Sequence, residues 1–254
     1  MSIIDDLIDS LETDAPVRDV RIGAYWTAVV VEKGDRMQGG LASTLRDEAH
    51  HHEKRPPVRE AGRLLELSAL DLAALARSDS LVEASVGMAA INALLEVDET
   101  ACTALNAREV IIEHGAGKRV AIVGHFPFIP RVRQAVEKLW VLEQRPRGDD
   151  LPAERAPEII PQADVVAITG TSLINHTFEE LIGLCCPEAF VLVLGPTTPL
   201  SPVLFDYGAD VISGTLVTDP ETVLRYVSQG ASFRQIKRSK GVKLLTLTKE
   251  ALQK

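Results

Sequence analysis

The chain has few cysteines and no long apolar run. Its three cysteines are Cys102, Cys185 and Cys186, and the adjacent pair cannot easily adopt ordinary disulfide geometry. This pattern argues against a disulfide framework and favours a reducing compartment, so we expect a cytoplasmic protein. No apolar run approaches membrane-spanning length, and Met1–Asp6 carries acids where a secretory signal carries bases. The sequence therefore predicts neither membrane insertion nor export.

Basic residues are also scarce. The 254-residue chain has 27 Lys and Arg against 36 Asp and Glu, which gives a net charge of -9. Such a charge repels phosphate backbones and anionic membrane surfaces, so we expect no nucleic-acid partner. A small molecule is the expected ligand, and a homodimer is the default expectation for a soluble oligomer.

The first part of the chain mixes strand and helix patterns. Strands are predicted at 17–22, at 25–31 and after a turn at 33–35, and helices at 61–66, 70–76 and 81–95. Ser80 and Glu83 have the spacing of a capping box for the last of these helices. Strands followed by helices predict a small α+β domain over residues 1–104.

From residue 118 the pattern becomes strand, loop, helix. Apolar runs predict strands at 119–123, 140–142, 164–169, 190–194, 209–212 and 242–247. Short continuous runs separated by helix-length segments indicate a parallel sheet covered on both faces. Pro130 is expected to open a helix that runs to about Lys138, and residues 145–161, with four prolines, are expected to form a surface connection. The prediction is a Rossmann-like α/β domain of five or six strands over residues 105–254.

Ligands of such sheets bind beyond the carboxyl ends of the strands. Three predicted helix starts follow strand ends closely: Thr177–Glu180, which has capping-box spacing, Ser201–Pro202 and Asp219–Pro220. Their free N–H groups and positive dipole ends can converge on one crevice. The sequence thus predicts a site there that suits an anionic group.

Two loops supply candidate ligand contacts. The loop after residue 169 combines a glycine, which allows close backbone approach, with hydroxyls and an amide that offer uncharged hydrogen bonds. The alternative is that Asn175 only caps the next helix. The loop after residue 194 holds two prolines, and its rigidity suits a pocket wall or a plain turn. The candidates in these loops are Gly170, Thr171, Ser172, Asn175, Gly195 and Thr198.

Gly124 and His125 follow a strand where a dinucleotide fold places its glycine-rich turn. The fingerprint is absent, because the side chains of His125, Phe126 and Pro127 would obstruct the pyrophosphate seat. Glu143, about twenty residues on at the next strand end, is nevertheless placed to bind a ribose hydroxyl. An enzyme that uses NAD or S-adenosylmethionine is therefore one alternative.

His125 is also the candidate for proton transfer or metal ligation, because the unperturbed pKa of histidine lies near neutrality. The alternative is an imidazole that satisfies a backbone carbonyl. Cys185 and Cys186 lack a second cysteine pair, which argues against a structural zinc site. A divalent transition metal with His125 as a ligand is the candidate cofactor.

A histidine run, His50–His52, lies among Asp47, Glu48 and Glu53. Consecutive helical side chains diverge, so three adjacent histidines cannot ligate one ion, although Asp47 with His51, or Glu48 with His52, could. A solvated linker is the expectation for this segment.

Taken together, the motifs resemble the prokaryotic family named "putative heavy-metal chelation". The segments that carry the resemblance are Arg21–Ala28, Gly40–Ala42, Gly87–Asn92, Val123–Pro127, Ile168–Thr177 and Gly195–Pro202. The resemblance implies a domain like the small N-terminal domain of enolase, joined to a Rossmann-like domain, with a site between them. It also implies a role in metal chelation or in metal-cofactor biosynthesis of the cobalamin type. The residues it places in the cleft are Asn92, Gly124, His125, Thr171, Asn175, Gly195 and Thr198.

The leading hypothesis is a protein that binds a small anionic or metal-chelating ligand in the interdomain cleft, with or without acting on it. A non-catalytic metabolite sensor or carrier is the second alternative. His125, Asn92 and Asn175 are the candidate catalytic residues, and His125 is the candidate metal ligand. The candidate cofactor-binding residues are Gly124, Glu143, Gly170, Thr171, Ser172, Gly195 and Thr198.

Overall fold

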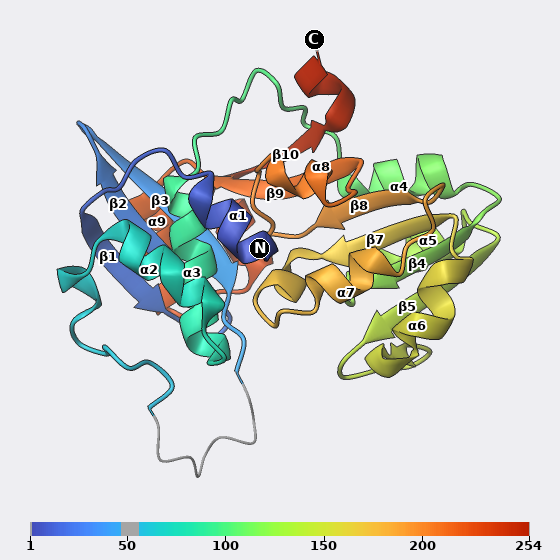
Figure 1. Ribbon diagram of the computed structural model, residues 1–254, viewed down its shortest axis with the longest axis horizontal. Coiled ribbons are helices and arrows are strands. Elements are labelled where there is room, and N and C mark those ends of the chain that lie inside the picture. The colour runs from blue at the N-terminus through green and yellow to red at the C-terminus, as the bar shows by residue number, and fades with distance from the viewer. Residues whose placement is uncertain (1, 47–55, 254) are drawn as a thin grey trace.

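The computed structural model describes residues 2–46 and 56–253, and contains two sheets flanked by helices (Figure 1). One sheet has three strands in the order β1-β2-β3, and the other has seven in the order β10-β9-β8-β7-β4-β5-β6. This mixed α/β architecture confirms the predicted fold class. The histidine run His50–His52 and its neighbouring acids lie outside the described residues.

The small sheet is antiparallel and its strands follow the predicted pattern. They are β1 (Val17–Ile22), β2 (Trp26–Lys33) and β3 (Arg36–Ser43). One face packs against α3 (Leu81–Leu94), and α1 (Ile3–Asp9) and α2 (Ala69–Ala74) join the same apolar cluster. Helix α3 is buried along most of its length, because it lies between the sheet and α2.

The large sheet is parallel except at β10. Its strands are β4 (Arg119–Val123), β5 (Lys138–Glu143), β6 (Leu151–Pro152), β7 (Val165–Thr169), β8 (Phe190–Leu194), β9 (Val211–Val217) and β10 (Val242–Thr248). The helices are α4 (Ala107–Gly115), α5 (Ile129–Arg133), α6 (Ala156–Ile159), α7 (Phe178–Gly183), α8 (Val203–Asp206), α9 (Pro220–Ser228) and α10 (Phe233–Arg238). Strand residues are buried on both faces, as their continuous apolar runs predict.

Two predicted capping boxes are wrong. The Ser80 hydroxyl donates to the Pro57 carbonyl oxygen instead of capping α3, and the Glu83 carboxylate accepts hydrogen bonds from Arg59 and Ser78. The Thr177 hydroxyl donates to Asn175 Oδ1 and does not cap α7. In both cases a tertiary or neighbouring partner competes with the local cap. The Asp219 cap of α9 is confirmed by its bond with the Thr222 amide.

Other element boundaries also differ from the prediction. Residues 61–66 form only a short 3-10 helix, Leu64–Glu66, and α5 ends at Arg133, so that β5 begins at Lys138. Residues 145–161 contain β6 and α6, and β6 brings the sheet to seven strands. Strand β9 (Val211–Val217) continues five residues beyond the predicted strand end at residue 212.

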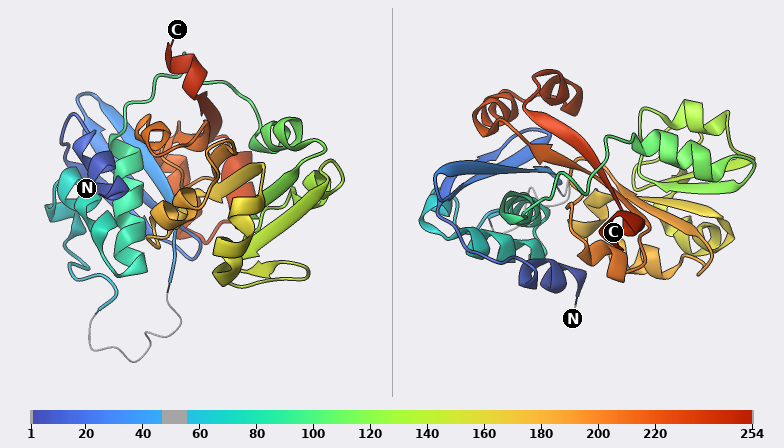
Figure 2. Two further views of the ribbon diagram at one scale, coloured as in Figure 1. Left: turned by 45° about the vertical axis from the view of Figure 1, so that its right-hand side comes forward. Right: turned by 90° about the horizontal axis from the view of Figure 1, so that it is seen from above.

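The two sheets share helices and core. Helix α9 packs on the second face of the small sheet, where Val223 and Val227 join the cluster of Ala28 and Leu41. Figure 2 (right) shows the small sheet between α1–α3 on one side and α9–α10 on the other. The largest cluster of buried apolar side chains contains residues of both halves of the chain, from Ile3 in α1 to Leu247 in β10. None of the helices in the described residues has the length and apolar character needed to cross a membrane.

Candidate functional site

Strands β4 and β7 are neighbours in the sheet, and the helices that follow them pack on opposite faces of the sheet. After β4 the chain enters α5, whose Ile129 and Val132 pack on one face of the sheet. After β7 it enters α7, whose Phe178 and Leu181 pack on the other face. The carboxyl ends of such a strand pair form the usual ligand crevice of an open α/β sheet.

Glycines at this edge bring three strand ends close together. Gly124 has a φ of 104°, and a Cβ there would lie 3.1 Å from Thr169 Cβ. A Cβ on Gly170 would lie 2.4 Å from Thr198 Oγ1, and Gly195 has a φ of 117°. Any larger residue at Gly124 or Gly170 would force these strand ends apart.

The Phe126 ring lies across this glycine-lined surface. Its Cε2 atom is 3.3 Å from the Cβ position of Gly124, and its Cε1 atom is 3.9 Å from that of Gly195. The ring also stacks on Phe128, with centroids 5.1 Å apart. It therefore stands where a dinucleotide fold seats its pyrophosphate, which agrees with the missing fingerprint.

His125 is held by a buried carboxylate. Its Nδ1 lies 2.8 Å from Asp150 Oδ2, and the Asp150 side chain is 3% exposed while that of His125 is 38% exposed. An ionised carboxylate only accepts hydrogen bonds, so a neutral imidazole in this contact has its proton on Nδ1 and its lone pair on Nε2. Metal-ligating histidines have this arrangement, in which the second nitrogen is oriented by a carboxylate.

Glu143 stabilises the same turn. Its Oε2 accepts the backbone N–H of His125 at 2.9 Å, and its Oε1 accepts that of Gln144. Both oxygens are thus engaged in shaping the loop that presents His125. This use of the carboxylate competes with the predicted ribose contact.

The hydroxyl-rich loop after β7 is largely bonded to itself. Thr169 and Thr171 share a hydrogen bond of 3.0 Å between hydroxyls, and the buried Ser172 hydroxyl donates to the Thr169 carbonyl. Asn175 Oδ1 accepts hydrogen bonds from the amide and hydroxyl of Thr177, just before α7, and this helix has no side-chain cap, so Asn175 does not cap it as the alternative supposed. Thr198 is 1% exposed, and its hydroxyl has no hydrogen-bond partner in the described part of the chain.

Several amides that were candidates for an anion site already have partners. The N–H groups of Gly124, Gly195 and Thr198 donate to backbone carbonyls, and that of His125 donates to Glu143. Two carboxylates, Glu143 and Asp150, also stand beside His125. The turn after β4 thus suits a ligand that offers an electron-pair acceptor such as a metal better than a bare anion.

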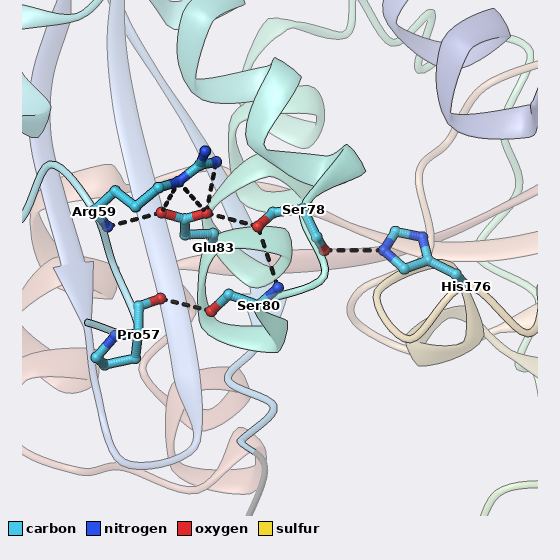
Figure 3. Close-up of polar contacts among 6 residues, drawn as sticks. All are labelled: Pro57, Arg59, Ser78, Ser80, Glu83 and His176. Carbon is cyan, nitrogen blue, oxygen red and sulfur yellow. Dashed lines mark hydrogen bonds and ion pairs between the residues drawn. The ribbon is translucent and has the colours of Figure 1, made fainter. Parts of the chain in front are cut away.

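Contacts between the small sheet and the large sheet occur next to this edge. Asn92 Nδ2 donates to the carbonyls of Leu41 and Thr197, both at 3.0 Å, and so joins β3 to the loop after β8. Farther along, His176 Nε2 bonds the Ser78 carbonyl oxygen at 3.1 Å, and Ser78 donates to Glu83 (Figure 3). The amide of Asn92 is therefore engaged in a contact between the two halves of the chain.

The structure brings most of the predicted residues to one edge. Gly124, His125 and Glu143 form one group, and Gly170, Gly195 and Thr198 form a second group beside it. Asp150 was missed, because it lies in the proline-rich stretch that was interpreted as a connection. Only its acid character marked it in the sequence.

A metal held by the protein alone does not fit the described residues. Among them, no three or more His, Cys, Asp and Glu side chains are grouped so that they could hold an ion. Burial raises the pKa of Cys185 to about 12, which keeps this thiol protonated and a poor ligand. A metal that arrives already chelated fits better, because it needs only one imidazole from His125.

Comparison with known proteins covers nearly the whole chain. The family model DUF364, described as "putative heavy-metal chelation", matches residues 106–246, and DUF4213, with the same description, matches residues 4–95. The uncharacterized protein MJ0500 of Methanocaldococcus jannaschii is 26% identical over 234 residues, which are 89% of this chain and 88% of that protein.

Two solved structures share the fold. A DUF364 protein of unknown function from Desulfitobacterium hafniense has a TM-score of 0.78 and 29% identity, covering 97% of each chain. Another from Pyrococcus horikoshii has a TM-score of 0.78 and 21% identity, covering 97% of this chain and 98% of that one. With the family matches over both halves, the chain belongs to the DUF364 family, described as "putative heavy-metal chelation".

Proposed function

We propose that this protein binds a metal chelate of a small organic ligand at the carboxyl edge of the large sheet, with His125 as one ligand of the metal. The observation that carries the proposal is the hydrogen bond from His125 Nδ1 to the buried Asp150, while Nε2 has no hydrogen-bond partner among the described residues. The description of the family, "putative heavy-metal chelation", supports a metal as part of the bound ligand. An intermediate of metal-cofactor biosynthesis, of the cobalamin type, has the required chemistry.

The charges at the site restrict the ligand. Glu143 and Asp150 lie against His125, so a strongly anionic complex would be repelled. A neutral or cationic chelate with one open coordination position suits the imidazole better. In this proposal Asn92 and Asn175 support the site without touching the metal, because their amides have partners in the chain.

Copper(II) iminodiacetate is a neutral chelate that leaves a position for an imidazole, and its binding can be measured by calorimetry. The run His50–His52 could bind this probe by itself, so all proteins should carry alanine at these three positions. In that background we expect His125→Ala to weaken binding at least about tenfold, which corresponds to about 1.4 kcal/mol. The melting temperature should fall, because the buried Asp150 carboxylate loses the hydrogen bond from Nδ1, so binding should be measured well below the melting temperature of both proteins.

Two further variants sharpen the test. Asp150→Asn can donate to Nδ1 and so favours the tautomer with a proton on Nε2, which should also weaken binding. His114→Gln removes a histidine that stacks on Phe190 elsewhere and should leave binding unchanged. Equal affinities in the His125→Ala and His114→Gln proteins would refute the proposal.

A further inference from the structure

A separate cavity of about 400 Å³ lies between the two halves of the molecule. Its walls come from α1, from the segment between α2 and α3, and from the turn between β7 and α7. Figure 1 shows α1 at this junction, between α3 and α8. The volume lies in the range of sites for small organic molecules.

We call the buried apolar part of the cavity lining its floor. Ile4, Leu173 and Phe178 line it, and they are 4%, 1% and 1% exposed. These side chains come from both halves, so a ligand seated on them would contact both. A floor of this kind accepts an aliphatic or aromatic side chain.

The more exposed part of the lining, which we call its rim, carries charged side chains of both signs. Arg77 uses Nε to bond Asp5 at 2.6 Å, and its two terminal nitrogens have no partner within residues 2–46 and 56–253. Arg77 lowers the pKa of Asp5 to about 2, so this pair stays ionised near neutral pH. Asp79 lines the cavity and has no hydrogen bond or ion pair among the described residues. Glu179 adds a second carboxylate, one oxygen of which accepts the Ile3 amide.

The wall between these charges is fixed in place. His176 has a left-handed backbone, with a φ of 58°, and its Nε2 donates to the Ser78 carbonyl. The Ser78 hydroxyl donates to the buried Glu83, which is also bonded to Arg59 (Figure 3). The segment that carries Arg77 and Asp79 is therefore preorganised, which reduces the entropy cost of binding.

We propose that this cavity binds a free α-amino acid with an apolar side chain. The terminal nitrogens of Arg77 would bind the carboxylate, Asp79 and Glu179 would bind the ammonium group, and the apolar floor would receive the side chain. A fork of guanidinium donors matches a carboxylate, and an unpaired carboxylate suits an ammonium group. This site is distinct from the edge at His125 and does not depend on the function proposed there.

Calorimetric titration of the full chain with L-leucine and L-phenylalanine tests the proposal. At least one should bind with a Kd below about 1 mM. N-acetyl-leucine lacks the ammonium charge and leucinamide lacks the carboxylate, so each should bind at least about tenfold more weakly than leucine. Asp79→Asn should cause a similar loss with an unchanged melting temperature, because Asp79 has no hydrogen-bond or ion-pair partner to lose within the described part of the chain.

Glu180→Gln is the matched control, because Glu180 is exposed on α7 next to Glu179 but does not line the cavity. It should bind as the parent protein does. The proposal is wrong if neither amino acid binds at 10 mM, a concentration about tenfold above the expected Kd. It is equally wrong if N-acetyl-leucine binds as well as leucine, or if Asp79→Asn binds as well as Glu180→Gln.

Discussion

At the scale of single residues, Glu83 is a buried carboxylate at the start of α3, and is 2% exposed. Burial raises its pKa, but hydrogen bonds from Arg59 and Ser78 outweigh this effect and hold the pKa below its usual value of 4.5. The charged form is therefore favoured in the folded protein. Through Ser78 it also supports the contact with His176 (Figure 3).

Glu83→Gln should lower the free energy of unfolding by about 1–3 kcal/mol at pH 7, since charge-assisted hydrogen bonds are lost in a buried place. A group whose folded pKa is lowered stabilises above its unfolded pKa and loses this effect as pH falls through the folded one. The difference between the two proteins should thus shrink below about pH 4.5. Urea unfolding at pH 7 and pH 3.5 measures both, with Glu180→Gln as the exposed control. A difference that stays constant between these pH values would contradict this account.

At the same scale, residue chemistry was partly predictable from the sequence. His125 was singled out because it follows a buried strand and because the unperturbed pKa of histidine lies near neutrality, and the structure gives it an orienting carboxylate. Asp150 could not be paired with it, because 25 positions separate them and no local pattern joins them. Asn92 and Asn175 have the polar character that suggests a site, but backbone and neighbouring groups use their amides.

At the scale of elements, Gly40 shows how β3 accommodates α3. A Cβ at this position would lie 2.0 Å from the Ala89 carbonyl oxygen and 2.4 Å from the Ala93 amide nitrogen. The helix therefore packs directly on the strand backbone, with no room for a methyl group. The small residues Ala89, Ala90 and Ala93 in the buried stretch of α3 fit the same close packing.

Gly40→Ala should lower the free energy of unfolding by at least about 2 kcal/mol, because strand and helix must separate. Gly183→Ala is the control: no atom lies within 4 Å of its Cβ position and its φ is not positive. This change should be neutral or stabilise the protein by up to about 1 kcal/mol. Chemical denaturation measures the free energy of unfolding of both variants. Equal values would show that α3 can move away from β3 at little cost.

Element type was predictable where burial made a run continuously apolar. Strands β4, β5, β7, β8 and β10 of the large sheet are of this kind, and they were located to within two residues at each end, whereas β6 was missed. The prediction ended β9 too early, because the polar residues in the second half of this strand are also typical of a loop. In the fold Ser213 is buried and bonds the Thr246 hydroxyl at 2.7 Å, a pairing with β10 that the local sequence cannot reveal.

At the scale of the whole molecule, the two halves depend on each other. Helix α9 covers a face of the small sheet that would otherwise expose Ala28 and Leu41. Trp26 and Phe233 also contact each other across the halves, with ring centroids 5.3 Å apart. We therefore regard the division near residue 104 as a proposal about chain organisation and not about independent folding.

A fragment of residues 1–104 should not form a stable domain, because it lacks the helix that buries one face of its sheet. The intact protein should unfold in a single cooperative transition. Circular dichroism and amide-proton dispersion of the fragment, with calorimetry of the full chain, measure both. A folded fragment, or two separated transitions in the full chain, would show that the halves are independent.

The central claim concerns one nitrogen, His125 Nε2, and electron paramagnetic resonance of bound copper(II) iminodiacetate observes it directly. The protein should carry alanine at positions 50–52, so that the histidine run does not contribute. The account predicts splitting from one imidazole nitrogen in this protein and its loss in the additional His125→Ala variant. An imidazole signal that persists unchanged without His125 would contradict the account.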